Sequence, residues 1–287
     1  MRILVSLRCS VMAIGLTFVC ALPASAQQRP LTTEDPESIG AGRVLVEGGV
    51  DFANDQTYPV SGLEGNLWRL PSVGVSVGIS SIAEIQIDGG LFNHLSISTR
   101  NPSAPLASSV TATGSGTSDV EDFVMGTKVR LAAETPGRPA FGFRFATKLP
   151  NASNESGLGT DTTDFFASLL VAKTIQSVRL VGNVGLGILA DPTDGDRQND
   201  VLTYGFSLAR AVTQQAEFVG EVNGRVSTRA GSPPPGTETR SLLKFGGRYT
   251  QGTIRFDAAG FVGLTSIDPT IGVTAGVTYV FDAFTVP

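Results

Sequence analysis

His94 is the only histidine in the chain, so it is the first residue to consider for acid–base chemistry. Ser96 and Ser98 follow it, and the alternation of the segment predicts that His94 and Ser96 point to the inner side of a strand. A Ser–His hydrolase also needs a third group to orient the histidine, and no motif supplies one. We therefore expect no catalytic residue and no enzyme activity, and a hydrolase built on His94 is the weakest alternative.

Metal and cofactor chemistry also lack suitable residues. A lone histidine cannot form a His-based metal site, and the only cysteines are Cys9 and Cys20, near the N-terminus. Gly182, Gly185 and Gly187 resemble a nucleotide-binding fingerprint only loosely, because no helix pattern follows them. We expect no metal site and no cofactor. The net charge of −5 argues against a nucleic-acid partner.

The N-terminus has the layout of a secretory signal peptide. Arg2 and Arg8 precede an apolar stretch at 9–22, which is too short for a lasting membrane helix, and Ala24-Ser25-Ala26 forms a small-x-small cleavage site. Cleavage would remove residues 1–26 together with both cysteines. Residues 27–42 are predicted to form an N-terminal periplasmic segment, and the sequence leaves open whether they enter the interior of the next domain.

Residues 43–281 show the pattern of a transmembrane antiparallel β-barrel, an all-β fold. Apolar residues alternate with Gly, Ser, Thr and charged residues, and glycine reaches 34 of 287 residues. About twelve strands are expected, an even number that is typical of bacterial barrels. They are 43–54, 67–79, 83–97, 122–132, 140–149, 164–174, 178–189, 200–211, 216–226, 239–249, 253–264 and 271–281, and residues 282–287 form a short C-terminal tail.

The connections alternate between short and long. Short ones fall at 80–82, 133–139, 175–177, 212–215 and 250–252, and longer ones, rich in turn-forming residues, at 55–66, 98–121, 150–163, 190–199, 227–238 and 265–270. Short periplasmic turns and long external loops are typical of barrels in the bacterial outer membrane, and they predict that both termini are periplasmic. A soluble β-sandwich, the alternative fold, would rarely keep this rhythm.

Charged residues identify the inner face of the strands, because a charge facing lipid costs about 2–4 kcal/mol near the midplane. Seven acids and ten bases are predicted to line the lumen. They form either paired charges that brace the wall or a charged constriction that selects a solute, with modest anion preference if the pore is open. The residues are Glu47, Asp51, Glu84, Asp88, Glu217, Glu221, Asp257, Lys128, Arg130, Arg144, Lys148, Arg179, Arg225, Arg240, Lys244, Arg248 and Arg255.

The last strand carries an assembly signal. Thr274, Gly276, Tyr279 and Phe281 fit the pattern polar–x–Gly–x–x–aromatic–x–hydrophobic by which outer-membrane barrels are recognised for insertion. Other aromatic residues cluster near both strand ends, as in the two girdles at membrane interfaces. The expected partners are therefore outer-membrane lipid and the barrel-assembly machinery, and we expect a monomer.

Five runs resemble one family. VMGTKVRLAAE (124–134), GTDTTDFFASLLVAKT (159–174), VGNVGLGILADP (181–192), LARAV (208–212) and GFVGLTSIDPTIGVTAGVTYVF (260–281) are similar to the outer-membrane transporters of the "MetA-pathway of phenol degradation" family. The resemblance covers roughly residues 120–281. It implies a β-barrel and the passage of aromatic or other hydrophobic compounds, and it carries over no set of site residues.

The function predicted from the sequence is therefore passive uptake of small molecules by an outer-membrane channel or transporter. The main alternative is a structural or surface-interaction barrel whose lumen is closed by salt bridges. The transported solute is not specified by the sequence.

Overall fold

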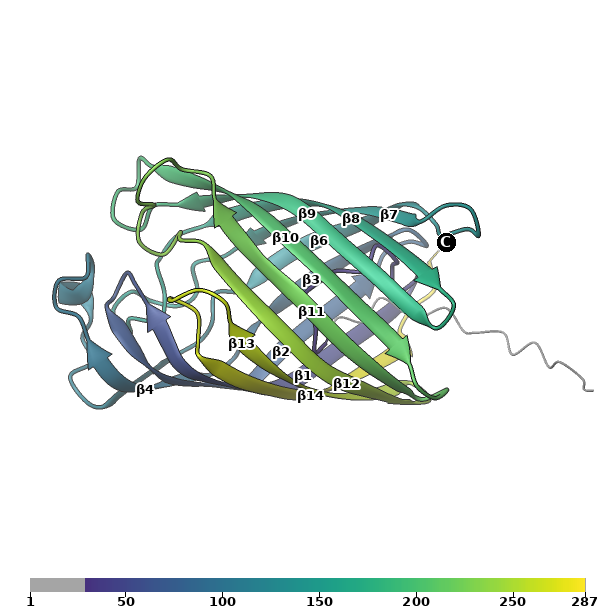
Figure 1. Cartoon of the computed structure of the whole chain (residues 1–287), viewed down its shortest axis with the longest axis horizontal. Coiled ribbons are helices and arrows are strands. Elements are labelled where there is room, and N and C mark those ends of the chain that lie inside the picture. Colours follow the sequence, from purple (N-terminus) through teal and green to yellow (C-terminus); the bar gives the residue numbers. More distant parts are fainter. Residues whose placement is uncertain (1–28, 287) are drawn as a thin grey trace, which may run out of the picture.

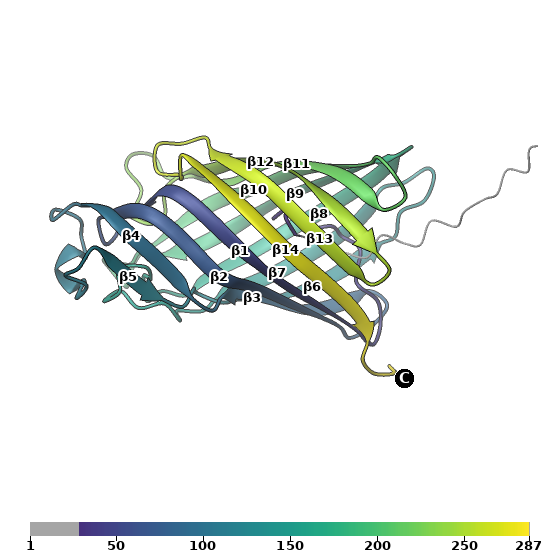
Figure 2. The same ribbon diagram turned by 90° about the horizontal axis from the view of Figure 1, so that it is seen from below.

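The computed structural model describes residues 29–286, which form a closed, tilted β-barrel (Figure 1). The predicted signal peptide, its cleavage site and Gln27 lie outside the described residues. Figure 2 shows the same barrel from below, with the strands inclined to the long axis as barrel closure requires. Among the described residues no helix is long and apolar enough to cross a membrane.

The wall contains twelve strands, as predicted. One of these wall strands is divided into β3 and β4, and β5 pairs with β4 beyond the wall, so fourteen strands are numbered. Each wall strand pairs with its antiparallel neighbours, and pairing of β1 with β2 and with β14 closes the barrel. The strands are β1 (Arg43–Tyr58), β2 (Leu63–Gly78), β3 (Ala83–Gly90), β4 (Asn93–Arg100), β5 (Gly116–Asp119), β6 (Val124–Ala132), β7 (Ala140–Lys148), β8 (Asp164–Ile175), β9 (Val178–Ala190), β10 (Gln198–Ala211), β11 (Ala216–Ser227), β12 (Arg240–Gln251), β13 (Ile254–Gly263) and β14 (Ile271–Asp282).

The barrel has two different rims. Arg43 and Asp282 pair at one of them, which we call the terminal rim, because the wall begins and ends there. The long connections gather at the opposite end, which we call the loop rim (Figure 1). This separation agrees with the alternation of short and long connections in the sequence. Which rim faces the periplasm stays a prediction.

The third wall strand is interrupted, and this changes which residues face inward. β2 pairs with β3 on one side of Leu70-Pro71 and with β4 on the other, and backbone hydrogen bonds join Leu70 to Phe92 and Leu91 to Pro71 at the break. The register of β2 against β3 and β4 is continuous across the break, whereas β2 has a bulge at Leu70-Pro71 against β1, between Gly49 and Asp51, and the alternation of side chains changes there. Buried residues therefore fall at even positions in β3 and at odd positions in β4.

The inward placement of His94 was therefore wrong. Asn93 and Leu95 are buried on the inner side, whereas His94 lies on the outer side. Its Nδ1 is 2.7 Å from Ser118 Oγ, and its ring stacks on Phe92. Ser96 and Ser98, the candidate partners in the hydrolase alternative, form no hydrogen bond with it among residues 29–286.

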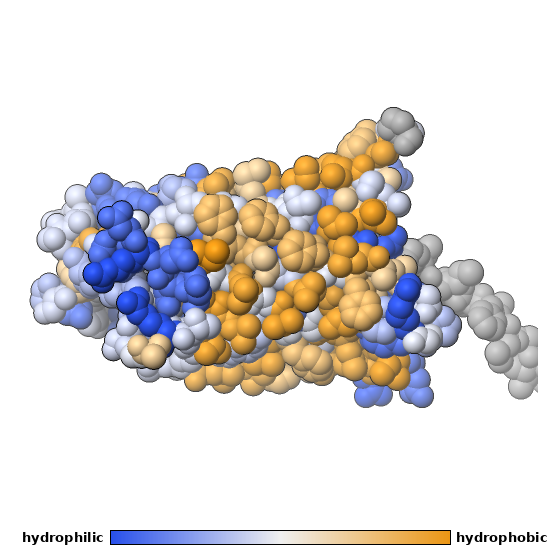
Figure 3. Space-filling model, turned by 90° about the horizontal axis from the view of Figure 1, so that it is seen from above, coloured by the Kyte–Doolittle hydropathy of each residue, from blue (hydrophilic) through white to orange (hydrophobic). Residues whose placement is uncertain are grey.

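The outer surface carries a broad apolar band between two polar ends (Figure 3). Large apolar side chains along the strands are exposed on it, including Leu169 at 58%, Leu186 at 60% and Phe206 at 50%. In water such a contiguous surface would be unfavourable, whereas in a bilayer it meets acyl chains. This band identifies the barrel as a transmembrane one.

Aromatic residues lie near both ends of the band. Towards the loop rim, Phe52 and Trp68 are cross-strand partners with ring centroids 4.8 Å apart. At the terminal rim, Tyr279 stacks on Phe281 with centroids 5.3 Å apart. Such rings suit the two interfaces of a membrane.

We expect Ala258→Lys to destabilise the inserted barrel by about 2–4 kcal/mol, because Ala258 is exposed within the apolar band. Ala258→Leu, which adds a similar bulk without charge, is the matched control and should be nearly neutral. The fraction of protein that is folded in lipid vesicles is measured at increasing urea concentration. The migration of unboiled samples in SDS gels distinguishes the folded barrel from the unfolded chain. Equal effects of lysine and leucine would contradict the assignment of this face to lipid.

Candidate functional site

Residues 29–42, which we call the inner segment, lie inside the barrel. Arg29 reaches Ser72 and Thr274 on opposite neighbours of β1, about halfway along the wall. Ile39 lies close to the terminal rim, where its backbone N–H donates to Glu84 (2.7 Å) and its side chain packs with Leu45 and Val280. The segment thus runs from mid-height to the terminal rim and continues into β1. The sequence left this placement open.

Three acids of the inner segment bind bases on the wall. Glu34 lies 3.3 Å from Lys128 and 3.0 Å from Arg144. Asp35 accepts two hydrogen bonds from Arg179, and Glu37 lies 2.6 Å from Arg130.

These four bases come from β6, β7 and β9, so the segment is attached to one side of the wall near the terminal rim. Lys128 also lies 3.0 Å from Glu84, and the lysine side chain is only 1% exposed. Charges buried this deeply must be paired to be tolerated. The network therefore fixes both the segment and the neighbouring strands.

The upper part of the segment is held by the opposite wall. The backbone N–H groups of Thr32 and Thr33 donate to Glu221 on β11. Lys244 donates to the Pro30 carbonyl at 2.8 Å, and Arg248 donates to the Arg29 carbonyl at 2.8 Å. The wall thus satisfies backbone groups that a non-regular segment would otherwise leave unpaired in the interior.

Glycines on the inner side of the wall make room for the segment. A Cβ at position 276 would lie 2.4 Å from Arg29 Nε, and one at position 142 would lie 2.9 Å from the Cβ of Pro36. A Cβ at position 205 would lie 2.8 Å from Thr33 Oγ1. These glycines permit a close approach that any side chain would obstruct. Part of the high glycine content therefore reflects the inner segment.

Above the segment the lumen is hollow. A cavity of about 660 Å³ lies towards the loop rim, and a second of about 510 Å³ extends down to Arg29. They share lining residues, so we treat them as one space, the chamber. The shared residues include Asp51, Arg69, Glu121, Val124, Phe166, Leu242 and Phe261.

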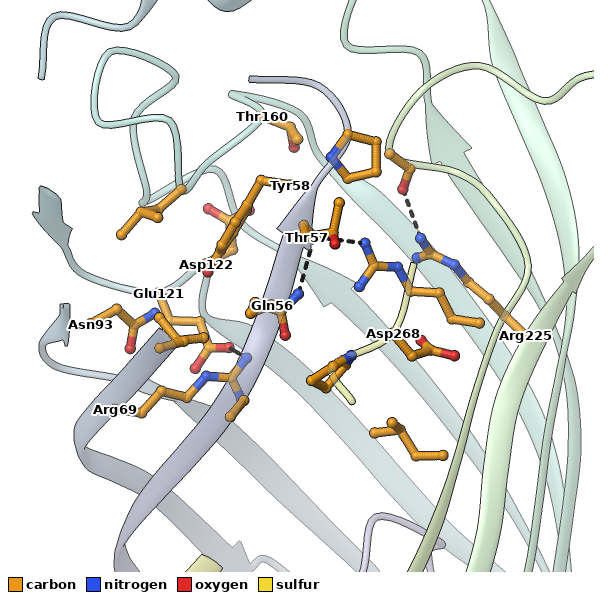
Figure 4. Close-up of a pocket in the computed structure, with 18 of the residues that line it drawn as sticks. Gln56, Thr57, Tyr58, Arg69, Asn93, Glu121, Asp122, Thr160, Arg225 and Asp268 are labelled. Carbon is orange, nitrogen blue, oxygen red and sulfur yellow. Dashed lines mark hydrogen bonds and ion pairs between the residues drawn. The ribbon is translucent and has the colours of Figure 1, made fainter. Parts of the chain in front are cut away.

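The chamber wall combines charged and apolar groups. Arg69 pairs with Glu121 at 2.9 Å, and both lie across the chamber from Arg225 in Figure 4. Phe166 from β8 and Phe261 from β13 supply aromatic surface at the level where the two cavities join. A space of this size and lining accepts a small organic molecule.

One acidic side chain, that of Asp119, fixes a loop near the chamber. Asp119, beyond the wall, accepts hydrogen bonds from the Ser153 N–H (2.8 Å) and hydroxyl (2.9 Å). Partial burial opposes its ionisation, but hydrogen bonds from Ser156, Ser153 and Val120 outweigh burial and lower the pKa of Asp119. Its contribution to stability is therefore present above the ordinary aspartate pKa and is lost as the pH falls through the lowered value. This aspartate steadies the loop whose residues Gly157 to Thr160 line the chamber.

The structure places eleven of the seventeen predicted lumen residues in contact with the inner segment. They are Glu47, Asp51, Glu84, Lys128, Arg130, Arg144, Arg179, Glu221, Lys244, Arg248 and Asp257. The other six bond elsewhere on the inner wall: Asp88 to Arg144, Lys148 to Asp122 and Asp164, Glu217 to Arg248, Arg225 to the Glu238 and Gly236 carbonyls, Arg240 to the Thr57 carbonyl and Arg255 to Thr250.

The inner segment alters the charge balance of the lumen. It contributes three acids, Glu34, Asp35 and Glu37, and one base, Arg29, which the strand pattern could not reveal. With the predicted seven acids and ten bases this makes ten acids and eleven bases, and the chamber lining adds the acids Glu121, Asp122 and Asp268 and the base Arg69. The basis for the expected anion preference is correspondingly weaker, because bases no longer outnumber acids in the lumen. In the sequence, only the cluster of acids at 34–37 indicated that residues outside the strands could contribute charge to the lumen.

Comparison with known proteins shows the fold. No protein-family model matches the chain, and no curated protein sequence matches it. The COG4313 outer membrane channel from Pseudomonas putida F1 is similar in structure, with a TM-score of 0.61, 10% identity, and coverage of 86% of this chain and 98% of that chain. The NanC porin is also similar, with a TM-score of 0.52, 8% identity, and coverage of 82% and 98% respectively.

At these identities the likeness is one of architecture. It shows that the chain has the closed antiparallel barrel found in outer-membrane proteins. The resemblance to the "MetA-pathway of phenol degradation" family rests on the sequence runs alone and stays a prediction.

Proposed function

We propose that this protein is a channel of the bacterial outer membrane through which small molecules pass passively. The observation that carries the proposal is the chamber, a cavity of about 660 Å³ joined to one of about 510 Å³, inside a transmembrane wall. A barrel that served only as a scaffold would gain packing contacts if side chains filled this space. The structural similarity of this protein to two barrels named as a channel and a porin supports the same proposal.

The solutes are proposed to be aromatic or other hydrophobic compounds. Phe166, Phe261 and Leu242 present apolar surface where the two cavities join. Such surface favours the passage of rings over that of strongly hydrated solutes. The family resemblance implies the same class of compound.

The inner segment is proposed to act as a gate. It occupies the lumen between the chamber and the terminal rim, so a solute that enters the chamber must displace it or pass beside it. Its attachments are hydrogen bonds and ion pairs, which water or a solute can replace, and the backbone pairing that closes the wall does not include the segment. Both termini are proposed to be periplasmic, with insertion directed by Thr274, Gly276, Tyr279 and Phe281 and the barrel working as a monomer.

One observation favours a second candidate, the structural barrel with a closed lumen. The ion pairs of Glu34, Asp35 and Glu37 fill the terminal half of the lumen and would brace the wall without any transport. The two candidates differ in whether a solute crosses.

Reconstitution into liposomes separates these candidates. The mature protein should admit benzyl alcohol-sized neutral solutes, measured by the rate of liposome swelling, and the rate should rise with protein content. Liposomes with an equal amount of heat-unfolded protein are the control. A correctly folded barrel, resistant to SDS without boiling, that leaves the swelling rate at the control level would favour the closed structural barrel.

Lys148→Gln should move the ion selectivity of an open channel towards cations. Lys148 lines the chamber and lies 3.2 Å from Asp122 and 3.0 Å from Asp164, so its loss leaves two carboxylates without their base. The reversal potential under a salt gradient measures this shift, which should shrink at high ionic strength because of screening. Lys173→Gln, at a turn of the terminal rim, is the matched control. An unchanged reversal potential in a conducting channel would exclude the chamber from the ion path.

A further inference from the structure

Two arginines lie side by side on the chamber wall near the loop rim. Arg225 on β11 and Arg240 on β12 are direct cross-strand partners, and both line the larger cavity. Directly opposed residues of antiparallel strands have Cβ atoms about 4.5–5.5 Å apart. Two guanidinium groups are therefore held close together beside an open space.

Neither arginine has an acidic partner. Arg225 donates to the carbonyls of Glu238 (3.0 Å) and Gly236 (2.7 Å), and Arg240 donates to the carbonyl of Thr57 (3.3 Å). Figure 4 shows Arg225 and the carbonyl contacts at the edge of the chamber. Within residues 29–286 no carboxylate forms an ion pair with either group.

The other bases of the chamber differ in this respect. Arg69 pairs with Glu121 and Lys148 with Asp122. The nearby carboxylate of Asp268 instead accepts from the Ser241 N–H (2.9 Å) and from Thr265. The Nε of Arg240 is buried without a hydrogen-bond partner in the described chain.

This arrangement is unfavourable without an anion. Like charges placed directly opposite on neighbouring strands repel each other, and a buried donor without an acceptor loses its hydration. A carboxylate placed between the two groups would offset the repulsion and accept hydrogen bonds from the remaining N–H groups, since guanidinium matches carboxylate geometry.

Apolar surface lies directly below the two arginines. Leu242 is two residues further along β12 on the same inner face, about 7 Å along the strand at roughly 3.3 Å per residue. Phe261 on the neighbouring strand β13 lines the same cavity and is the cross-strand partner of Lys244, so it lies two residues beyond Leu242. The spacing along β12 between Arg240 and Leu242 is comparable to the length of a carboxylate with an attached six-membered ring.

We propose that Arg225 and Arg240 form a binding site for monocarboxylates that carry an aromatic or alicyclic ring. The carboxylate lies between the guanidinium groups, and the ring lies on Leu242 and Phe261. The site deepens the proposed function and rests on it, because it names one class of solute that the channel would admit from the loop rim. The carbonyl contacts of both arginines position the guanidinium groups and leave further N–H groups for the ligand.

Calorimetric titration of the mature protein in nanodiscs with benzoate tests the site. Benzoate should bind with one-to-one stoichiometry, and benzamide, which has the same ring and no charge, should bind at least tenfold more weakly. Arg225→Gln/Arg240→Gln should weaken benzoate binding at least tenfold and leave benzamide unchanged. Arg229→Gln, which removes an exposed charge from the adjoining loop, is the matched control and should bind benzoate as the natural protein does.

Folding is checked by resistance to SDS without boiling, and Arg240→Gln alone replaces the double variant if the latter fails that check. Equal binding of benzoate and benzamide, undetectable benzoate binding, or unchanged binding by the folded variants would each overturn the site. The liposome assay separates this failure from that of the channel. Swelling without benzoate binding rejects the site and keeps the channel, whereas binding without swelling keeps the site and rejects the channel.

Discussion

Lys128→Met should lower the free energy of unfolding by about 3–5 kcal/mol, because it leaves two buried carboxylates without their cation. Lys128 Nζ lies 3.3 Å from Glu34 and 3.0 Å from Glu84, whose side chains are 7% and 0% exposed. Methionine fills a similar volume but provides no charge and no donor. Glu34 keeps Arg144 at 3.0 Å, so Glu84 should bear most of the cost.

The midpoint of unfolding in urea, followed by tyrosine fluorescence and by SDS migration, measures this change. Lys173→Met is the matched control, because Lys173 near the end of β8 forms a partly exposed ion pair with Glu134, and pairs in contact with solvent contribute about 1 kcal/mol or less. If both substitutions lower stability by the same small amount, the buried network does not hold the inner segment to the wall.

The twelve wall strands were predictable because each has one face towards lipid and one towards the lumen. This environment explains why apolar and polar residues alternate with a period of two along each strand. The connections are long at one rim and short at the other. β13 is a clear case, since exposed Phe256 and Ala258 alternate with buried Arg255 and Asp257. Whether the charged residues fall at odd or at even positions thus indicates the inner face of a strand without any knowledge of the neighbouring strands.

The placement of His94 was not predictable from periodicity. The alternation changes at residues 91–92, because β3 and β4 stay in register with β2 and β2 has a bulge at Leu70-Pro71 against β1. A break of this kind depends on the neighbouring strand, which is invisible in a local pattern. An unbroken strand over 83–97 was therefore the simplest interpretation, and it placed His94 on the wrong side.

The position of the inner segment inside the barrel was not predictable for a related reason. Residues 29–42 have no strand or helix periodicity, and their partners lie far away in the sequence, as with Thr32 and Glu221 or Lys244 and Pro30. Local composition indicates only that this stretch is non-regular. Its position depends on inward glycines and bases that come together after the barrel closes.

A disulfide between the inner segment and the wall should prevent passage of solutes. A Cβ at position 205 on β10 would lie 3.4 Å from the Cβ of Thr33, close to the typical separation of about 3.5–4.5 Å in disulfides. Thr33→Cys/Gly205→Cys should therefore cross-link under oxidation. The only natural cysteines, Cys9 and Cys20, belong to the predicted signal peptide, so no other thiol should compete. Thr33→Cys and Gly205→Cys alone are the matched controls.

Single-channel recording of Thr33→Cys/Gly205→Cys in planar bilayers, before and after addition of dithiothreitol, tests the central claim most directly. The oxidised protein should show no openings, and reduction should restore openings like those of the single-cysteine controls, because a released segment can leave the lumen. Equal conductance in the oxidised and reduced states would contradict the gate. Silence of the reduced protein and of both controls, in barrels shown to be folded, would contradict the channel itself.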